Sequence, residues 1–197
     1  MTPQGGTDRR EQRRTATRER LLAAALELFA AQGYAATTYD HIAERADVGR
    51  QTAFNYFRRK EDFVTAWIEQ RHELLDRREA ADTAAGRSAV EALADVLQEL
   101  SDLMVEEYEL AKGLFDGGVL QAVFGFGART PRAILATVAR GQADGELRDD
   151  VSAEAIADLI ADAYVTAVVR WLAADGDYSL AENLLGRLEV LAGGFAA

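Results

Sequence analysis

The run TYDHIAERADVGRQTAFNYF, residues 38–57, decides the fold of this chain. Its first half predicts a short helix that begins after Thr38, because a threonine side chain caps helix N-termini well. Residues 47–49 predict a tight turn, since Asp47 accepts a left-handed backbone more readily than most residues. A second short helix follows over residues 50–57, and three of its side chains are expected to face inward: Ala53, Phe54 and Phe57. Two short helices joined in this way, after a longer one, are typical of a helix-turn-helix.

Longer helices are predicted on both sides of this run. Upstream, apolar residues recur on one helical face: Leu21, Leu22, Ala25, Leu28 and Phe29. Gly33 can take the left-handed backbone that ends such a helix. Downstream, two acidic residues at 61–62 suit the positive end of a fourth, long helix. The inner face of that helix is expected to carry Phe63, Trp67 and Leu74.

The whole chain is predicted to be all-α, with about nine helices. Only two prolines occur among 197 residues, and no segment alternates polar and apolar residues as a strand does. The expected organisation is a three-helix helix-turn-helix domain over residues 15–62 and a helical domain over residues 63–197, whose residues 63–85 form a connecting helix. Residues 1–14 are polar and rich in arginine and glycine, and are expected to form a flexible basic arm.

Composition excludes several classes of protein. The chain has no cysteine, so disulfides and thiolate metal sites are ruled out. No apolar run approaches the ~20 residues of a membrane span, and no signal peptide precedes the first helix, so the expected location is the cytoplasm. The net charge of −11 divides into +4 over residues 1–60 and −15 over the rest. A basic head on an acidic body suits local contact with nucleic acid, although a disordered arginine-rich tail would give the same split.

The outward face of the second short helix carries side chains that can read DNA bases: Arg50, Gln51, Thr52 and Asn55. Arginine pairs with guanine, and glutamine or asparagine with adenine. Groups suited to phosphate surround them: Thr38, Tyr56, Arg58, Arg59 and Lys60. Each of these residues alone fits an ordinary solvated helix face. Together with the turn and the basic run, they predict a DNA-binding surface.

Residues 15–62 resemble the DNA-binding domain of the TetR family of bacterial transcription regulators. The matching features are Gly33-Tyr34, Thr37-Thr38, Ile42-Ala43, Thr52, Tyr56-Phe57 and Lys60-Glu61-Asp62. The family usually has glycine at the position of Asp47, a serine or threonine at Gly49, tyrosine at Phe54 and proline-serine at 58–59. The resemblance implies a homodimer that binds a near-palindromic operator in double-stranded DNA, acts as a repressor and is released by a small apolar effector.

The resemblance also implies where the effector and the second subunit bind. Aromatic and sulfur-containing residues of the middle helices are candidates to line a pocket: Trp67, Met104, Tyr108, Phe115, Phe124, Phe126 and Tyr164. Plain core packing would give the same stripe. Apolar residues of the last two long helices are candidates for the dimer interface: Ala163, Ala167, Val168, Trp171, Leu184 and Leu188. They are equally what an internal core would contain.

An enzyme is the main alternative, and its requirements are not met. The two histidines, His41 and His72, are far apart in sequence. The carboxylate clusters at 106–109 and 149–150 are better explained as a solvated helix face and a helix start. No catalytic residue, metal site, cofactor or membrane contact is therefore predicted. A DNA-binding protein that has lost its pocket remains a second alternative.

Overall fold

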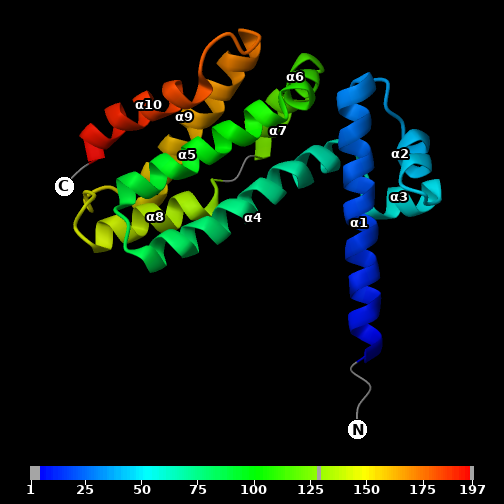
Figure 1. Cartoon of the computed structure of the whole chain (residues 1–197), viewed down its shortest axis with the longest axis horizontal. Helices are drawn as coiled ribbons and strands as arrows, with labels where there is room; N and C mark the ends of the chain where they lie inside the picture. Colours follow the sequence, from blue (N-terminus) through cyan, green and yellow to red (C-terminus); the bar gives the residue numbers. More distant parts are fainter. Residues whose placement is uncertain (1–4, 128–129, 196–197) are drawn as a thin grey trace.

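The computed structural model describes residues 5–127 and 130–195, and within them it contains ten α-helices and no strand. The all-α prediction is confirmed (Figure 1). The helices are α1 (Gly5–Gln32), α2 (Tyr39–Arg45), α3 (Arg50–Tyr56), α4 (Glu61–Ala85), α5 (Ala89–Glu106), α6 (Tyr108–Asp116), α7 (Val119–Gly127), α8 (Arg132–Ala143), α9 (Ala153–Ala173) and α10 (Leu180–Phe195).

The C-terminal half of α1, the helices α2 and α3, and the start of α4 enclose an aromatic core. The Phe57 and Phe63 rings stack with their centroids 4.0 Å apart, and the Phe29 ring meets Phe63 edge-on at 6.3 Å. All three side chains are buried. Gly33 ends α1 with a φ of 83°, and the Tyr34 ring then packs back on Phe29 at 5.0 Å. The core therefore joins the helix-turn-helix to the first turn of α4.

The helix α1 begins at Gly5, so most of the segment expected to be an irregular arm is helical. Figure 1 shows its N-terminal half projecting beyond α2 and α3. Residues 9–16 are exposed, and the Thr17 hydroxyl donates to the Arg13 carbonyl at 2.8 Å. The physical reason is that arginine, glutamate and glutamine are good helix formers. Extension of a helix already anchored by packing is far easier than nucleation of a new one.

Two side chains expected to face inward are exposed. Phe54 is 47% exposed, because it follows the buried Ala53 on α3 and so lies about 100° further around that helix. Leu74 is 38% exposed, and Leu75 is fully buried instead. The buried stripe of α4 advances in steps of four residues, through Arg71 to Leu75. Because Arg71 is charged, the pattern of apolar residues in the sequence did not show which face of α4 is buried.

The helices α4 to α10 form the second half of the molecule. Within it α8 packs against α4, α5 and α9, and α10 packs against α5 and α9. A capping box begins α5, because the Ser88 hydroxyl accepts from the Glu91 amide at 3.2 Å and the Glu91 carboxylate accepts from the Ser88 amide. Ser152 caps α9, with the Ala155 amide as donor.

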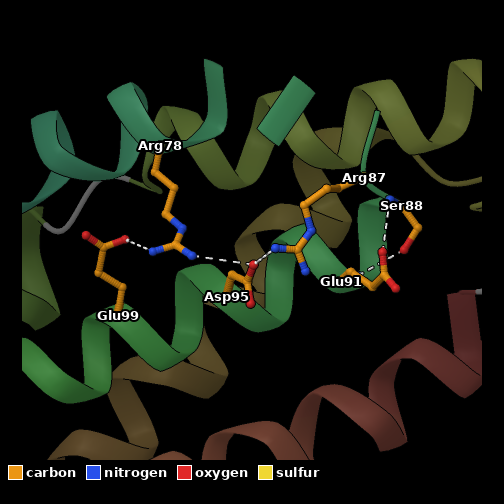
Figure 2. A network of polar contacts seen from close by, with 6 residues as sticks. All are labelled: Arg78, Arg87, Ser88, Glu91, Asp95 and Glu99. Carbon is orange, nitrogen blue, oxygen red and sulfur yellow. Dashed lines mark hydrogen bonds and ion pairs between the residues drawn. The ribbon is translucent and has the colours of Figure 1, made fainter. Parts of the chain in front are cut away.

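Ion pairs connect the C-terminal half of α4 and the loop after it to α5 (Figure 2). The Arg78 guanidinium lies between Glu99, at 3.1 Å, and Asp95, at 3.5 Å. Arg87 also pairs with Asp95. Partly exposed pairs of this kind contribute at most about 1 kcal/mol each. Their effect is mainly to set how α4 lies on α5.

Gly141 of α8 is expected to tolerate no side chain, because a Cβ there would lie 2.5 Å from the Ala89 Cβ and 2.8 Å from the Leu147 Cδ1. We expect G141A to lower the free energy of unfolding by about 1–3 kcal/mol. The Tm should fall by about 2–4 °C for each of these kcal/mol, as measured by circular dichroism. Gly193→Ala is the control, since a Cβ at Gly193 meets nothing within 4 Å. An unchanged Tm in G141A would contradict the close approach of α8 and α5.

Candidate nucleic-acid interface and ligand cavity

The turn between α2 and α3 has the geometry expected from the sequence. The Thr38 hydroxyl accepts from the His41 amide at 3.3 Å and so caps α2. Asp47 has a φ of 52°, and Gly49 is the N-cap of α3 with no side-chain hydrogen bond. Ile42 and Ala43 of α2 and Ala53 of α3 are buried together. This packing leaves the opposite face of α3 on the surface.

The residues predicted to read bases lie on that face. Arg50, Gln51 and Asn55 are exposed and Thr52 is half-buried. Arg50 forms an ion pair with Asp40 of α2 at 3.3 Å, and the Gln51 amide donates to the Asn55 side chain at 3.2 Å. These are exposed contacts, which water or a base edge can replace at low cost.

The residues predicted to bind phosphate border the same helix. Tyr56 is half-buried, and Arg58 and Arg59 are exposed. Asp62 organises this segment: its carboxylate accepts from the backbone amides of both arginines, at 3.1 and 2.9 Å, and from the Arg59 Nε at 3.2 Å. The Arg58 side chain has no ion-pair partner within residues 5–127 and 130–195. Of the two arginines, Arg58 therefore has the guanidinium more readily available to an incoming anion.

Lys60 has a structural role that its sequence position does not reveal. Its ammonium donates to the carbonyls of Tyr34, at 2.7 Å, and Thr37, at 2.9 Å, and lies 4.2 Å from the centre of the Tyr34 ring. Burial lowers its pKa, which nearby Glu61 raises in part. Two of the three ammonium donors are thus engaged by the loop between α1 and α2. One donor remains for a phosphate.

The aromatic residues around α3 include one surface group that the sequence analysis assigned to the core. The exposed Phe54 ring meets the Tyr39 ring at 5.9 Å, and the Tyr39 hydroxyl donates to the Phe57 carbonyl at 2.8 Å. Burial, with smaller contributions from Asp62 and Glu61, raises the pKa of Tyr39 to about 12, so the hydroxyl keeps this proton at neutral pH. Tyr39 thereby supports Phe54 on the exposed face of α3.

A cavity of about 300 Å³ lies between α4, α5, α7, α8 and α9. Four of the predicted pocket residues line it: Trp67, Met104, Phe124 and Tyr164. Tyr108 does not, and instead packs edge-on against Trp171 at 5.3 Å, and Phe115 packs at the core on α6. The side chain of Phe126 lies outside the part of the chain that can be described. The spacing of apolar residues could not distinguish the side chains that line the cavity from those in the core, because both groups have the same helical spacing.

The polar side chains of the cavity wall were not predicted from the sequence. Arg71 and His72 come from α4, Asp158 and Asp162 from α9, and Thr130 precedes α8. The Thr130 hydroxyl donates to Asp158, and Pro131 rather than Thr130 is the N-cap of α8. The sequence did contain a signal for Asp158 and Asp162, since residues four positions apart lie on the same face of a helix.

Burial determines the protonation of the other titratable groups on this wall. It lowers the pKa of His72, which favours the neutral imidazole at pH 7. It raises the pKa of Tyr164 to about 12 and lowers that of Arg71 to about 10. At neutral pH the wall therefore presents a protonated phenol and a positively charged guanidinium.

Five of the six residues expected at a dimer interface belong to the core of the single chain. These buried residues are Ala167, Val168, Trp171, Leu184 and Leu188. Ala163 is half-buried and borders an open groove with Gly186, Val190 and Leu191. Val190 is 78% exposed. The same helical spacing serves an interior and an interface, so the sequence could not distinguish the buried face from the exposed one.

No group of three or more histidine and carboxylate side chains within residues 5–127 and 130–195 is placed to hold a metal ion. In the same part of the chain, no helix combines the length and the apolar character needed to cross a membrane.

Two family models match the chain in succession. The model described as "Bacterial regulatory proteins, tetR family" matches residues 21–66. The model described as "TetR/AcrR family transcriptional repressors, C-terminal domain" matches residues 70–194, which is more than half of the chain. The first range holds the helix-turn-helix, and the second holds most of the residues that line the cavity.

Individual relatives agree with these matches. The transcriptional regulator TcmR of Streptomyces glaucescens is 48% identical over 62 residues, which are 31% of this chain and 26% of TcmR. The transcriptional repressor KstR of Rhodococcus jostii is 27% identical over 88% of this chain and 79% of its own. The structure of Thermus thermophilus FadR, a TetR-family repressor in complex with lauroyl-CoA, superposes with a TM-score of 0.72 at 30% identity, over 90% of this chain and 94% of that one. The chain therefore belongs to the TetR family of bacterial regulatory proteins.

Proposed function

We propose that the protein is a homodimeric transcriptional repressor of the cytoplasm that binds a near-palindromic operator and is released by a small, mostly apolar effector. Two features together carry this proposal: an exposed polar face on α3, and a cavity whose wall includes α4, the helix that directly follows α3. The proposal assigns a regulatory function and no catalytic one.

Direct base contacts are assigned to Arg50, Gln51, Thr52 and Asn55, at the exposed face of α3. The exposed Phe54 ring adds an apolar group suited to a thymine methyl. Phosphate contacts are assigned to the groups that border this face: Thr38, Tyr56, Arg58, Arg59 and the third donor of Lys60. Charge-assisted contacts of this kind supply affinity, and base contacts supply specificity.

The helix α4 provides a mechanical path from the cavity to the DNA-binding surface. Its first turn carries Phe63, which is buried among the aromatic side chains of the N-terminal core, and Trp67 one turn later lines the cavity. A ligand that displaces the cavity wall would therefore tilt α4 and change the separation of the two reading helices in a dimer. A coupling free energy of about 1–3 kcal/mol would suffice for control.

The dimer is assigned to the exposed face of α9 and α10 that borders the groove of Ala163, Gly186 and Val190. We expect Val190→Glu to give a monomer, because it would bring two like charges, one from each subunit, into the interface. Light scattering with size-exclusion chromatography measures the mass. Val105→Glu is the matched control, since Val105 is 52% exposed on α5. If Val190→Glu stayed dimeric and Val105→Glu became monomeric, the dimer interface would lie on another face of the molecule.

Fluorescence anisotropy with DNA from upstream of the protein's own gene tests the function. We expect tight binding that weakens steeply as salt increases, because phosphate contacts release counterions. Lauroyl-CoA is the first effector to add, because the FadR structure at 30% identity holds it. Weak binding that does not depend on sequence would reject the repressor assignment.

A further inference from the structure

Arg71 is a buried cation on the wall of the cavity. The residue is only 6% exposed, and its guanidinium stacks 3.8 Å from the centre of the Trp67 ring. One terminal nitrogen donates to the Trp67 carbonyl at 3.3 Å, and the other pairs with the Glu107 carboxylate. The Nε of Arg71 has no acceptor among the described residues. A buried donor without an acceptor is costly, so this position favours the arrival of an oxygen atom.

Glu107 connects this cation to the junction of two other helices. It is both the C-cap of α5 and the N-cap of α6. Its Oε2 accepts from the Trp67 Nε1 at 2.8 Å and also pairs with Arg71. Two side chains of α4 are therefore attached to one carboxylate at the α5–α6 junction.

The helix α6 carries this connection to the N-terminal domain. It packs along α1, where a Cβ on Gly113 would lie 3.7 Å from the Phe29 carbonyl oxygen. A Cβ on Gly117 would lie 3.8 Å from the Tyr34 Cβ. A change at Glu107 can thus reach the helix-turn-helix along α4 and along α6.

We propose that Arg71 binds a carbonyl or carboxylate oxygen of an otherwise apolar ligand, and that this draws the guanidinium away from Glu107 and frees α4 from the α5–α6 junction. The second half of this inference rests on the proposed function, in which a ligand in the cavity controls operator binding. A largely buried guanidinium forms strong, charge-assisted hydrogen bonds, so it discriminates oxygen acceptors from ligands that lack them.

The opposite preference, for a ligand amine, would depend on Asp158 and Asp162. Both residues line the cavity, but both are exposed, so water screens their charge. Arg71 is buried and has an unsatisfied donor. The buried group is therefore expected to dominate selectivity.

Three probes with the same twelve-carbon chain test the assignment: lauroyl-CoA, lauric acid and dodecylamine, each below its critical micelle concentration. Titration calorimetry without DNA should give at least one oxygen-bearing probe a Kd about tenfold or more below that of dodecylamine. In Arg71→Met this ratio should fall to about one, while dodecylamine still binds. Retained dodecylamine binding shows that the variant has folded with its cavity.

Glu107→Gln and tryptophan fluorescence test the displacement step. Loss of the competing charge in E107Q should lower the Kd of the oxygen-bearing probe severalfold and reduce the probe concentration that releases operator DNA. The chain has two tryptophans, so Trp171→Phe leaves Trp67 as the reporter. Its emission should shift with the oxygen-bearing probe, because its Nε1 loses the contact with Glu107, and should not shift with dodecylamine.

The assignment is overturned if neither oxygen-bearing probe binds, if dodecylamine binds as tightly as they do, or if Arg71→Met keeps the preference of the natural sequence. It is likewise overturned if E107Q leaves the Kd of the oxygen-bearing probe unchanged, or if that probe leaves the Trp67 emission unchanged. Operator binding by the unliganded protein is measured separately. If the unliganded protein does not bind operator DNA, the proposed function is rejected. The ratio of the Kd values of the probes then still decides whether Arg71 is the polar contact of the cavity.

Discussion

Replacement of both Gln51 and Asn55 by alanine is expected to lower affinity for the operator about 100-fold, with little change in affinity for unrelated DNA. Both side chains are exposed on α3 and already lie within hydrogen-bond distance of each other, at 3.2 Å. A bidentate contact from glutamine or asparagine to adenine discriminates by about 1–3 kcal/mol, and two such contacts account for the expected loss. Neither side chain is part of the core, so stability should not change.

Anisotropy measured with operator and with scrambled DNA of equal length separates the two affinities. Arg58→Ala is the matched control, since Arg58 is an exposed cation at the border of the same surface. This variant should lower the affinity for both DNAs to a similar extent, and the salt dependence of binding should fall by about one counterion. If the Gln51/Asn55 double variant lowered the affinity for both DNAs equally, the two side chains would be phosphate contacts, and α3 would not read the base sequence.

Replacement of Phe63 by alanine is expected to destabilise the protein by about 3–5 kcal/mol. The ring is completely buried, stacks on Phe57 at 4.0 Å and meets Phe29 at 6.3 Å. Its loss would leave a cavity where α1, α3 and α4 meet. Because a domain of this kind is stable by only about 5–15 kcal/mol, the N-terminal domain should be largely disordered well below the Tm of the natural sequence.

Urea unfolding followed by circular dichroism measures the effect of F63A. The control is Phe54→Ala, which removes the same side chain from a position that is 47% exposed. That variant should keep nearly all of its stability and should alter operator binding instead. Equal destabilisation by the two changes would mean that Phe54 is buried in solution and that α3 is rotated about its axis.

The helix-turn-helix could be predicted almost completely because its determinants are local. The Thr38 cap, the left-handed Asp47 and the glycine that ends α1 each act on residues within one or two turns of the helix. Errors arose where a single residue breaks a simple pattern. Arg71 continues the buried stripe of α4 as a charged residue, and this led to the prediction that Leu74 rather than Leu75 faces inward.

The helical end of the arm was mispredicted for a related reason. Its lack of apolar periodicity correctly indicates that nothing packs against it, and residues 9–16 are indeed exposed. Helix formation there needs no packing, because α1 is already nucleated further along the chain. Apolar periodicity therefore indicates which part of a helix is buried, and does not indicate where the helix begins.

The sequence by itself determined the fold class, the helix-turn-helix and the residues on the exposed face of α3, because caps, turns and the spacing of apolar residues act over a few positions. Only the tertiary structure decided which apolar side chains line the cavity, that Lys60 is engaged by carbonyls of Tyr34 and Thr37, and that Arg71 meets Glu107 beside Trp67. The contacts of Lys60 and of Glu107 join residues from 23 to 40 positions apart. No local pattern encodes them, because they depend on how whole helices pack against one another.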